Sequence, residues 1–335
     1  IALIAVMAVL LVRQQDPVQA ALVMAATIGV AGFLQLSMLA LRGAKLAAPL
    51  RVSFDPEMRG FLGRAVPGMV ASGAPQWLMV AGAVIASTSP SAVSWLYFAN
   101  RLLELPLGIV GVAMGTVLIP EMTRAVRGGE QSAIAHAESR ALELAAGLAL
   151  PATLGLMVLS GPIVRMLFEH GAFTAEDSAA TAQALTWLTL ALPAHVLVKA
   201  LSPAFFARED TLTPLFATLK AIVVAIAAAF LLGHIFGASG IAAGIAFGAW
   251  SNALALIRKG ATTFGFSIDA AARRRLPRIL AAALAMGALL WLAETALPAA
   301  GAHGFVQAAS LVVLIAAGIA GYGLLLQLFG VAGWR

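Results

Sequence analysis

The sequence predicts an all-α polytopic membrane protein with about ten transmembrane segments. Of its 335 residues, 61% are hydrophobic and only 11% are charged, whereas soluble domains have an apolar share of roughly 45–50%. The mean hydropathy is +0.95. Runs of about 20 apolar residues recur along the whole chain, and each is long enough to cross a hydrocarbon core of ~30 Å. Together these observations exclude an ordinary soluble domain.

The apolar segments can be placed from the pattern alone. In chain order they are 1–12, 18–41, 62–87, 92–119, 141–159, 180–207, 213–234, 238–257, 277–297 and 305–329. The first is too short to span a bilayer, and it has neither the basic start nor the cleavage site of a signal peptide. The chain also begins with Ile1 rather than Met. We therefore expect it to begin inside a helix and to be the C-terminal part of a longer protein.

Helix starts are marked by capping residues. Asp55-Pro56 and Thr213-Pro214 have the pattern of an N-cap followed by proline in the first helical turn. Thr174 lies three residues before Asp177, which is the spacing of a capping box ahead of segment 180–207.

The basic residues predict the orientation of the chain. Most of the 21 lysines and arginines fall in the loops after every second apolar segment, and such an excess marks the cytoplasmic side. The C-terminus is therefore expected in the cytoplasm and the loop 168–177 outside. Because these cations flank membrane segments, the net charge of +6 does not indicate a nucleic-acid partner. The basic run 272–278 is interpreted as a cytoplasmic anchor, with anionic-lipid contact as the alternative.

Segment 92–119 carries a charge pair where lipid is expected. In a helix, one face collects polar residues and glycines, namely Ser94, Tyr97, Arg101, Glu104, Gly108, Gly111 and Gly115. Arg101 lies about 15 Å from the outer end at 1.5 Å per residue, close to the membrane midplane. A charge there costs at least ~2.5–3.5 kcal/mol unless it faces a partner or a water-filled cavity. We predict a wet cavity that binds an anion; the alternative is an ion pair in which Arg101 and Glu104 only neutralise each other.

Other polar and kinking residues lie within the apolar segments. His195, Lys199 and Ser202 share one face of segment 180–207, where Lys199 either faces the cavity or extends to the cytoplasmic interface. His195 alone is interpreted as a packing residue. Pro106 should bend the helix after the charge pair. Segment 62–87 is expected to be kinked and mechanical in role. The candidate hinge or gating residues are Pro106, Pro67 and Gly108.

Catalytic and metal-binding patterns are missing from the sequence. There is no cysteine, no cluster of His, Asp and Glu with hydrolase or metal spacing, and no glycine loop that follows a strand and holds a nucleotide. We therefore predict a protein that is not an enzyme and uses no metal or cofactor.

Three stretches resemble a known family. SWLYFANRLLELPLGIVGVAMGTVLIPEM (94–122), LFEHGAFTAEDS (167–178) and LSPAFFAREDTLTP (201–214) are similar to the MurJ/MviN family, the lipid II flippases of bacterial cell-wall synthesis. The resemblance covers essentially the whole chain. It implies a two-lobed exporter fold of fourteen helices, of which this chain holds the last ten. Residues 1–59 would then complete the N-terminal lobe, 60–258 form the C-terminal lobe, and 259–335 form a basic loop and an extra helix pair that lines a lipid-tail groove.

The resemblance also implies a function and a site. The family moves an undecaprenyl-diphosphate-linked precursor, lipid II, across the bacterial inner membrane by alternating access through a cationic cavity. Arg101 matches the family's cavity arginine and Glu104 its nearby acid. Asn100 stands where many members have Asp, so any role of that aspartate is in doubt here. Lys199 is a further cavity candidate. Expected partners are lipid II and membrane lipids, with cell-wall synthesis proteins as an open possibility.

Two rival functions remain at this stage. A drug or cation antiporter of the same superfamily would prefer intramembrane carboxylates, but Glu104 is the only deep acid and it lies beside a cation. A non-transporting scaffold for cell-wall enzymes would not need Arg101. Some family members are thought to use sodium, yet segments 62–87, 213–234 and 238–257 contain no Asp or Glu. Sodium needs hard oxygen ligands, so membrane potential or another driving force is favoured.

Overall fold

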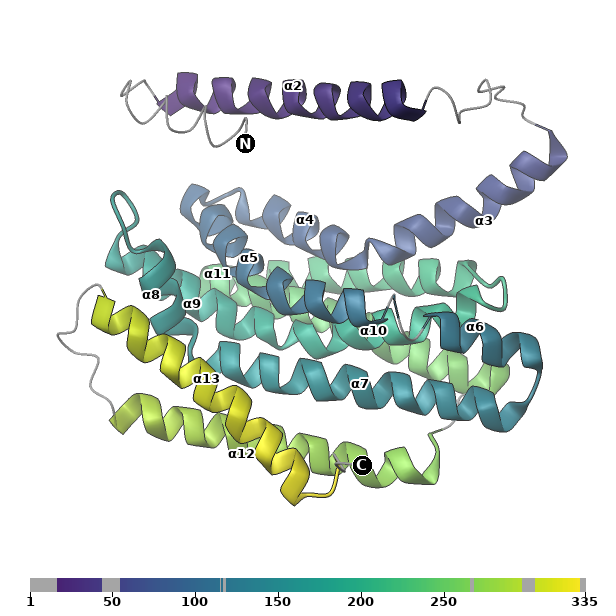
Figure 1. Ribbon diagram of the computed structural model, residues 1–335. Helices are drawn as coiled ribbons and strands as arrows, with labels where there is room; N and C mark the ends of the chain where they lie inside the picture. Colours follow the sequence, from purple (N-terminus) through teal and green to yellow (C-terminus); the bar gives the residue numbers. More distant parts are fainter. Residues whose placement is uncertain are drawn as a thin grey trace. The chain divides into compact units, whose positions relative to one another are not determined.

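The structure, a computed structural model, describes residues 17–43, 55–114, 116, 119–265, 268–296 and 305–331. All regular structure in these ranges is helical (Figure 1). The chain divides into two compact units, residues 1–59 and 60–335. The first unit contains α2 (Pro17–Gly43), whose described side chains are exposed or half-exposed along the whole helix. An apolar helix of 27 residues whose described side chains are exposed in this way is suited to contact with lipid or other helices.

The second unit is a bundle of short and long helices. In chain order its helices are α3 (Pro56–Ser72), α4 (Ala74–Ala86), α5 (Pro90–Ala113), α6 (Ile119–Gly128), α7 (Gln131–Val158), α8 (Ser160–Phe168), α9 (Ala175–Thr189), α10 (Ala191–Phe206), α11 (Leu212–Phe264), α12 (Ala270–Ala296) and α13 (Phe305–Leu328).

The helices α3 and α4 form one bent pair. Their axes differ by 59° across a break at Gly73. Pro67, where the sequence predicted a kink, lies inside α3, and the bend falls between the two helices instead. Pro75 stands in the first turn of α4, a position at which its missing N–H costs no helical hydrogen bond. The proline therefore marks the start of a new helix after the break.

The helix α11 folds back on itself at Gly237. This glycine has φ 58° and ψ −137°, a conformation that residues with a Cβ rarely adopt. On either side the two arms touch through glycines: a Cβ on Gly240 would meet the carbonyl of Leu232, and one on Gly244 would meet the backbone of Ala229. Gly240 faces Leu232, and four residues later Gly244 faces Ala229, which is three residues earlier on the other arm. The arms 212–236 and 238–264 therefore run antiparallel. The sequence predicted these two segments, and glycine lets them pack backbone to backbone.

The number of membrane-spanning segments agrees with an all-helical polytopic protein. Among the residues that the structure describes, seven helices are long and apolar enough to cross a membrane, or eight when the bent pair α3 and α4 is counted as one span. That count treats α11 as one helix although its two arms run in opposite directions. Counting the arms separately brings the described residues close to the ten segments predicted. The predicted segment 1–12 lies outside the described residues.

Two of the three predicted helix starts are confirmed. Asp55 Oδ1 accepts a hydrogen bond from the Met58 N–H at 2.9 Å, and Thr174 and Asp177 form the complete capping box of α9. The prediction for Thr213-Pro214 was wrong, because α11 begins at Leu212. Asp210 Oδ1 accepts a hydrogen bond from the Thr213 N–H at 2.9 Å. The carboxylate just before the helix therefore satisfies a first-turn N–H group that has no partner within the helix.

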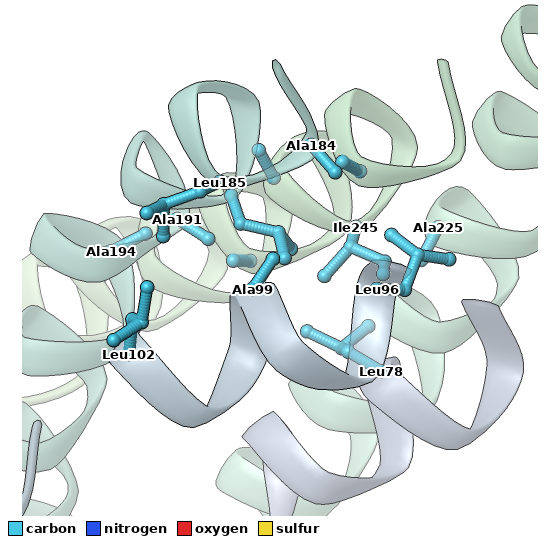
Figure 2. Close-up of a cluster of buried hydrophobic side chains, with 14 of the residues drawn as sticks. Leu78, Leu96, Ala99, Leu102, Ala184, Leu185, Ala191, Ala194, Ala225 and Ile245 are labelled. Atoms are coloured by element: carbon cyan, nitrogen blue, oxygen red, sulfur yellow. The ribbon is translucent and has the colours of Figure 1, made fainter. Parts of the chain in front are cut away.

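The buried core lies where α4, α5, α9 and α11 meet (Figure 2). Leu78, Leu96, Leu185 and Ile245 are each at most 2% exposed and come from these four helices. Alanines and glycines between them allow close helix contact, as expected where helices pack inside a membrane. The pair α12 and α13 packs on this bundle through α7 and α8.

Several helices extend beyond the predicted apolar segments. α7 begins at Gln131 and α12 at Ala270, well before the predicted starts at 141 and 277. Their extra turns are held by polar contacts: Ser139 Oγ accepts from the Asp269 N–H at 2.8 Å, and Arg275 pairs with Glu143 at 3.2 Å. Most of the predicted basic loop after residue 259 is therefore helical, because charged turns outside the apolar stretch stabilise each other.

Candidate functional site

The helix α5 separates an apolar face from a polar one. Leu96, Leu103 and Val110 are at most 3% exposed and face the bundle. On the opposite face Ser94, Tyr97, Arg101 and Gly108 are exposed, and Glu104 is half-buried. The apolar face of α5 is thus the one that anchors this helix in the core. Burial of that face leaves the polar face on the open side of the second unit.

Arg101, Glu104 and Asn100 form one cluster on this face. Arg101 Nη1 lies 2.7 Å from Glu104 Oε2, and Asn100 Nδ2 donates to Glu104 Oε1 at 2.9 Å. Both carboxylate oxygens are therefore engaged. The Arg101 side chain nevertheless remains 65% exposed. A guanidinium has five N–H donors, so pairing with Glu104 leaves donors that face away from the helix.

The geometry agrees in part with each of the two interpretations of the pair. The ion pair exists, as the neutralising interpretation requires. However, the exposed guanidinium is oriented by the carboxylate rather than covered by it. Asn100 holds the second oxygen of Glu104 from one turn before it. A cation fixed in this way is ready to accept an anion in the bidentate geometry that arginine favours.

Lys199 reaches from α10 toward α5. Its Nζ lies 3.4 Å from the position of a Cβ on Gly111, two turns beyond Glu104 on α5. In the described part of the chain no carboxylate lies within ion-pair distance of it. The side chain therefore lies beside α5. The absence of a side chain at Gly111 provides the space for its ammonium.

A cavity of about 490 Å³, with a mostly apolar lining that includes several polar side chains, is lined in part by Lys199. Its walls come from α3, α4, α6 and α10, and they include Ser72, Thr123, His195 and Ser202. His195 is only 4% exposed. The hydroxyls of Ser72 and Ser202 each donate to a backbone carbonyl one turn earlier at 2.7 Å. Arg101 is not part of this wall, so the structure brings Lys199 and His195 together and places Arg101 farther along α5.

Sequence reasoning missed one wall of this cavity. Glu209 lines it from the turn after α10 and pairs with Arg64 of α3 at 2.6 Å. Glu209 has φ 61°, which is uncommon for a residue other than glycine. No sequence pattern marks this contact, because the two residues are 145 positions apart. Arg64 and Glu209 come together only once the helices have packed into the bundle.

The predicted hinge residues are all inside helices. Pro106 lies within α5 and Pro67 within α3. Gly108 is exposed, and a Cβ added to it would meet no described atom within 4 Å. Their role in motion stays a prediction. No group of three or more His, Asp or Glu residues that could hold a metal ion occurs among the residues that the structure describes.

These features define a class of protein. The chain is part of a multi-pass helical membrane protein, and its second unit presents an exposed charged stripe and a cavity lined in part by polar side chains between otherwise apolar helices. Such intramembrane charges are typical of transporters whose cargo is polar.

Comparison with known proteins identifies the family. A family model described as "Lipid II flippase MurJ" matches residues 1–312, and the chain belongs to this family. It is 37% identical over 294 residues to "Probable lipid II flippase MurJ" of Rhizobium meliloti (strain 1021), covering 87% of this chain and 55% of that protein. The protein of the same name from Rhizobium tropici is 36% identical over 286 residues, covering 83% of this chain and 53% of that protein.

A solved structure shares the fold. "Lipid II flippase MurJ, inward closed conformation" superposes with a TM-score of 0.67 at 22% sequence identity, covering 83% of this chain and 56% of that one. The chain thus spans about half the length of the relatives that it matches.

Proposed function

We propose that this chain forms part of a flippase that moves an undecaprenyl-diphosphate-linked peptidoglycan precursor, lipid II, from the inner to the outer leaflet of the bacterial inner membrane. The observation that carries the proposal is the exposed Arg101 guanidinium at mid-helix, held in place by Glu104. Family membership supports the substrate, since the relatives are named for lipid II. No bond is made or broken in this process, so the protein acts as a transporter.

Arg101 supplies the contact with the diphosphate. Its free N–H donors match the spacing of phosphate oxygens, and hydrogen bonds between ions are roughly twice as strong as neutral ones. Glu104 competes with the phosphate for the same cation. Because Asn100 also holds Glu104, the carboxylate orients the guanidinium while substrate is absent and takes it back when the phosphate leaves.

Lys199 supplies a second cation nearer the cytoplasmic mouth. Positive residues mark the end of α10 as cytoplasmic, and Lys199 lies toward that end and lines the cavity. An ammonium is a compact point charge on a flexible stem. It therefore suits the first attraction of an anionic head group, whereas Arg101 suits its orientation deeper in the membrane.

Alternating access requires the lobe to change shape. The bend at Gly73 between α3 and α4 is a position where the angle between two half-helices can change. Pro67, Pro106 and Gly108 are the further hinge candidates on α3 and α5. The ion pair between Arg64 and Glu209 joins α3 to the end of α10, and this exposed contact is open to breaking as the helices move.

The remaining parts of the proposal concern the orientation and the roles of the lobes, and they are supported by the charge rule and by the family resemblance. The C-terminus is placed in the cytoplasm, and residues 60–258 form the C-terminal lobe after a last part of the N-terminal lobe in 1–59. Residues 259–335 provide the helix pair that borders the lipid tail. The driving force is proposed to be membrane potential, where one elementary charge over 100 mV contributes ~2.3 kcal/mol.

The experiment that tests the proposal replaces Arg101 in the full-length gene product. Arg101→Ala and Arg101→Lys would each be expressed in cells that depend on this protein for wall synthesis, with Arg274→Ala as the control at an exposed arginine of α12. We expect lysis and accumulated precursor on the inner leaflet for Arg101→Ala at normal membrane levels of the variant. Growth indistinguishable from Arg274→Ala with both substitutions would overturn the mechanism and favour a scaffold.

A further inference from the structure

A second pocket lies at the opposite end of the bundle from Lys199. It has a volume of about 440 Å³ and is formed where α7 ends, α9 begins and α12 ends. These are the ends of three membrane-spanning helices, at Val158, Ala175 and Ala296. The pocket is therefore at the membrane–water boundary, on the side that lacks the excess of basic residues and is outer by the charge rule.

Two carboxylates of this pocket are placed where helices disfavour negative charge. Glu169 is the C-cap residue of α8, and Glu294 lies in the last turn of α12. A helix C-terminus carries about half a negative charge from the aligned peptide dipoles, so it favours cations and repels carboxylates. Both side chains are half-buried. In the described part of the chain neither is within ion-pair distance of a cation.

Buried oxygens in the same wall are without a partner in the part of the chain that the structure describes. Ser178 is 2% exposed, and its Oγ has no hydrogen-bond partner there. Glu169 Oε2 is also buried without a partner among the described residues, and a carboxylate oxygen can be satisfied only by a donor. Buried polar atoms are nearly always hydrogen-bonded, and leaving one unpaired costs free energy. The pocket therefore fits a ligand that brings positive charge and hydrogen-bond donors.

The same pocket contains one cation. Arg165 is exposed and lines the wall from α8, and it pairs with neither glutamate in the described structure. Two carboxylates and one guanidinium held apart around a cavity match a ligand with an ammonium and an anionic group. A bare metal ion fits less well, because the described residues provide no group of three metal-binding side chains and the guanidinium repels it.

We propose that this pocket binds the head group of a zwitterionic phospholipid of the outer leaflet, with its primary ammonium between Glu169 and Glu294 and its phosphate on Arg165. The surface beside the pocket suits the rest of such a lipid. Trp291 and Leu292 of α12 are 57% and 54% exposed, and tryptophan is enriched at the boundary between lipid and water. This site goes beyond the proposed flipping of lipid II and links α12 to α8 through a bound lipid.

Lipid binding to the purified full-length protein tests this assignment. Native mass spectrometry would compare phosphatidylethanolamine, phosphatidylcholine and phosphatidylglycerol of identical chains. We expect phosphatidylethanolamine to bind about tenfold more tightly than the other two, because only its head group donates hydrogen bonds from a charged ammonium. In the Glu169→Gln and Glu294→Gln variants this preference should fall to near parity.

A carboxylate outside the pocket provides the control for this lipid-binding experiment. Glu176→Gln changes an exposed carboxylate in the first turn of α9 that does not line the pocket, and it should keep the preference. Equal binding of all three lipids, or an unchanged preference in Glu169→Gln and Glu294→Gln, overturns the proposal. Thermal stabilisation by Mg²⁺ alone that is lost in both variants would replace it with a metal site. None of these readouts depends on flipping, so they stand or fall separately from the Arg101 experiment.

Discussion

Gly244→Ala should separate the two arms of α11. A Cβ at this position would meet the backbone nitrogen, Cα and Cβ of Ala229 on the facing arm. No side-chain rotation relieves a contact with backbone, so the arms must move apart. Overpacking of a well-packed interior costs typically ~1–3 kcal/mol. The substitution also removes a helical glycine, which on its own contributes a gain of roughly 0.5–1 kcal/mol.

The expected net effect is a loss of about 0–2.5 kcal/mol in unfolding free energy, centred at ~1 kcal/mol, which is the overpacking cost less the helix gain. Gly155→Ala provides the matched control, because this glycine is also helical and a Cβ there would meet no described atom within 4 Å. Thermal unfolding of the detergent-purified full-length protein would measure both. We expect Gly244→Ala to lower the Tm and Gly155→Ala to leave it unchanged or higher. A Gly244→Ala variant at least as stable as Gly155→Ala would refute the hairpin contact.

Three further perturbations test other contacts. Trp95→Phe removes the 2.8 Å hydrogen bond to Asp177 that ties α5 to α9, and the lost bond to a charged group should cost roughly 1.5–3 kcal/mol of unfolding free energy. Thr174→Ala removes the capping box of α9 and should cost about 1 kcal/mol in the same measurement. Gly111→Leu fills the space beside Lys199 Nζ and should reduce flipping in a cellular assay without lowering protein levels.

Each of these three substitutions has a matched control variant. Trp187→Phe makes the same change at a tryptophan that is 46% exposed and takes no part in the hydrogen bond between Trp95 and Asp177. Thr174→Ser keeps the capping oxygen and should keep the stability. Val112→Leu enlarges an exposed residue next to Gly111 and should leave flipping unchanged. Equal effects in a variant and its control would argue against the contact concerned.

Much of the fold was predictable because the membrane imposes a strong pattern on sequence. Backbone groups in lipid must bond within the segment, so apolar runs of sufficient length become helices. The capping box at Thr174 was predictable because it involves only residues three apart. Asn100, Arg101 and Glu104 were likewise predictable as a cluster, since they lie within one turn of a single helix.

Predictions that depended on contacts between helices were less accurate. The bend near Pro67 lies at Gly73, and the start of α11 moves to Leu212 because Asp210 supplies the cap. The sequence showed a polar face on α5, but periodicity alone cannot distinguish a core-facing side from a lipid-facing one, and only the structure shows that Leu96, Leu103 and Val110 pack in the core.

The sequence by itself determined the class of protein, its helices and the charge pair of α5, because hydropathy and local spacing act over a few residues. Only the tertiary structure brought Lys199 beside Gly111 and placed Glu169 and Glu294 around one pocket. These groups come from helices far apart in the chain, and their proximity depends on how glycines, alanines and leucines pack between helices. That packing is a property of the assembled bundle, since no single segment carries it.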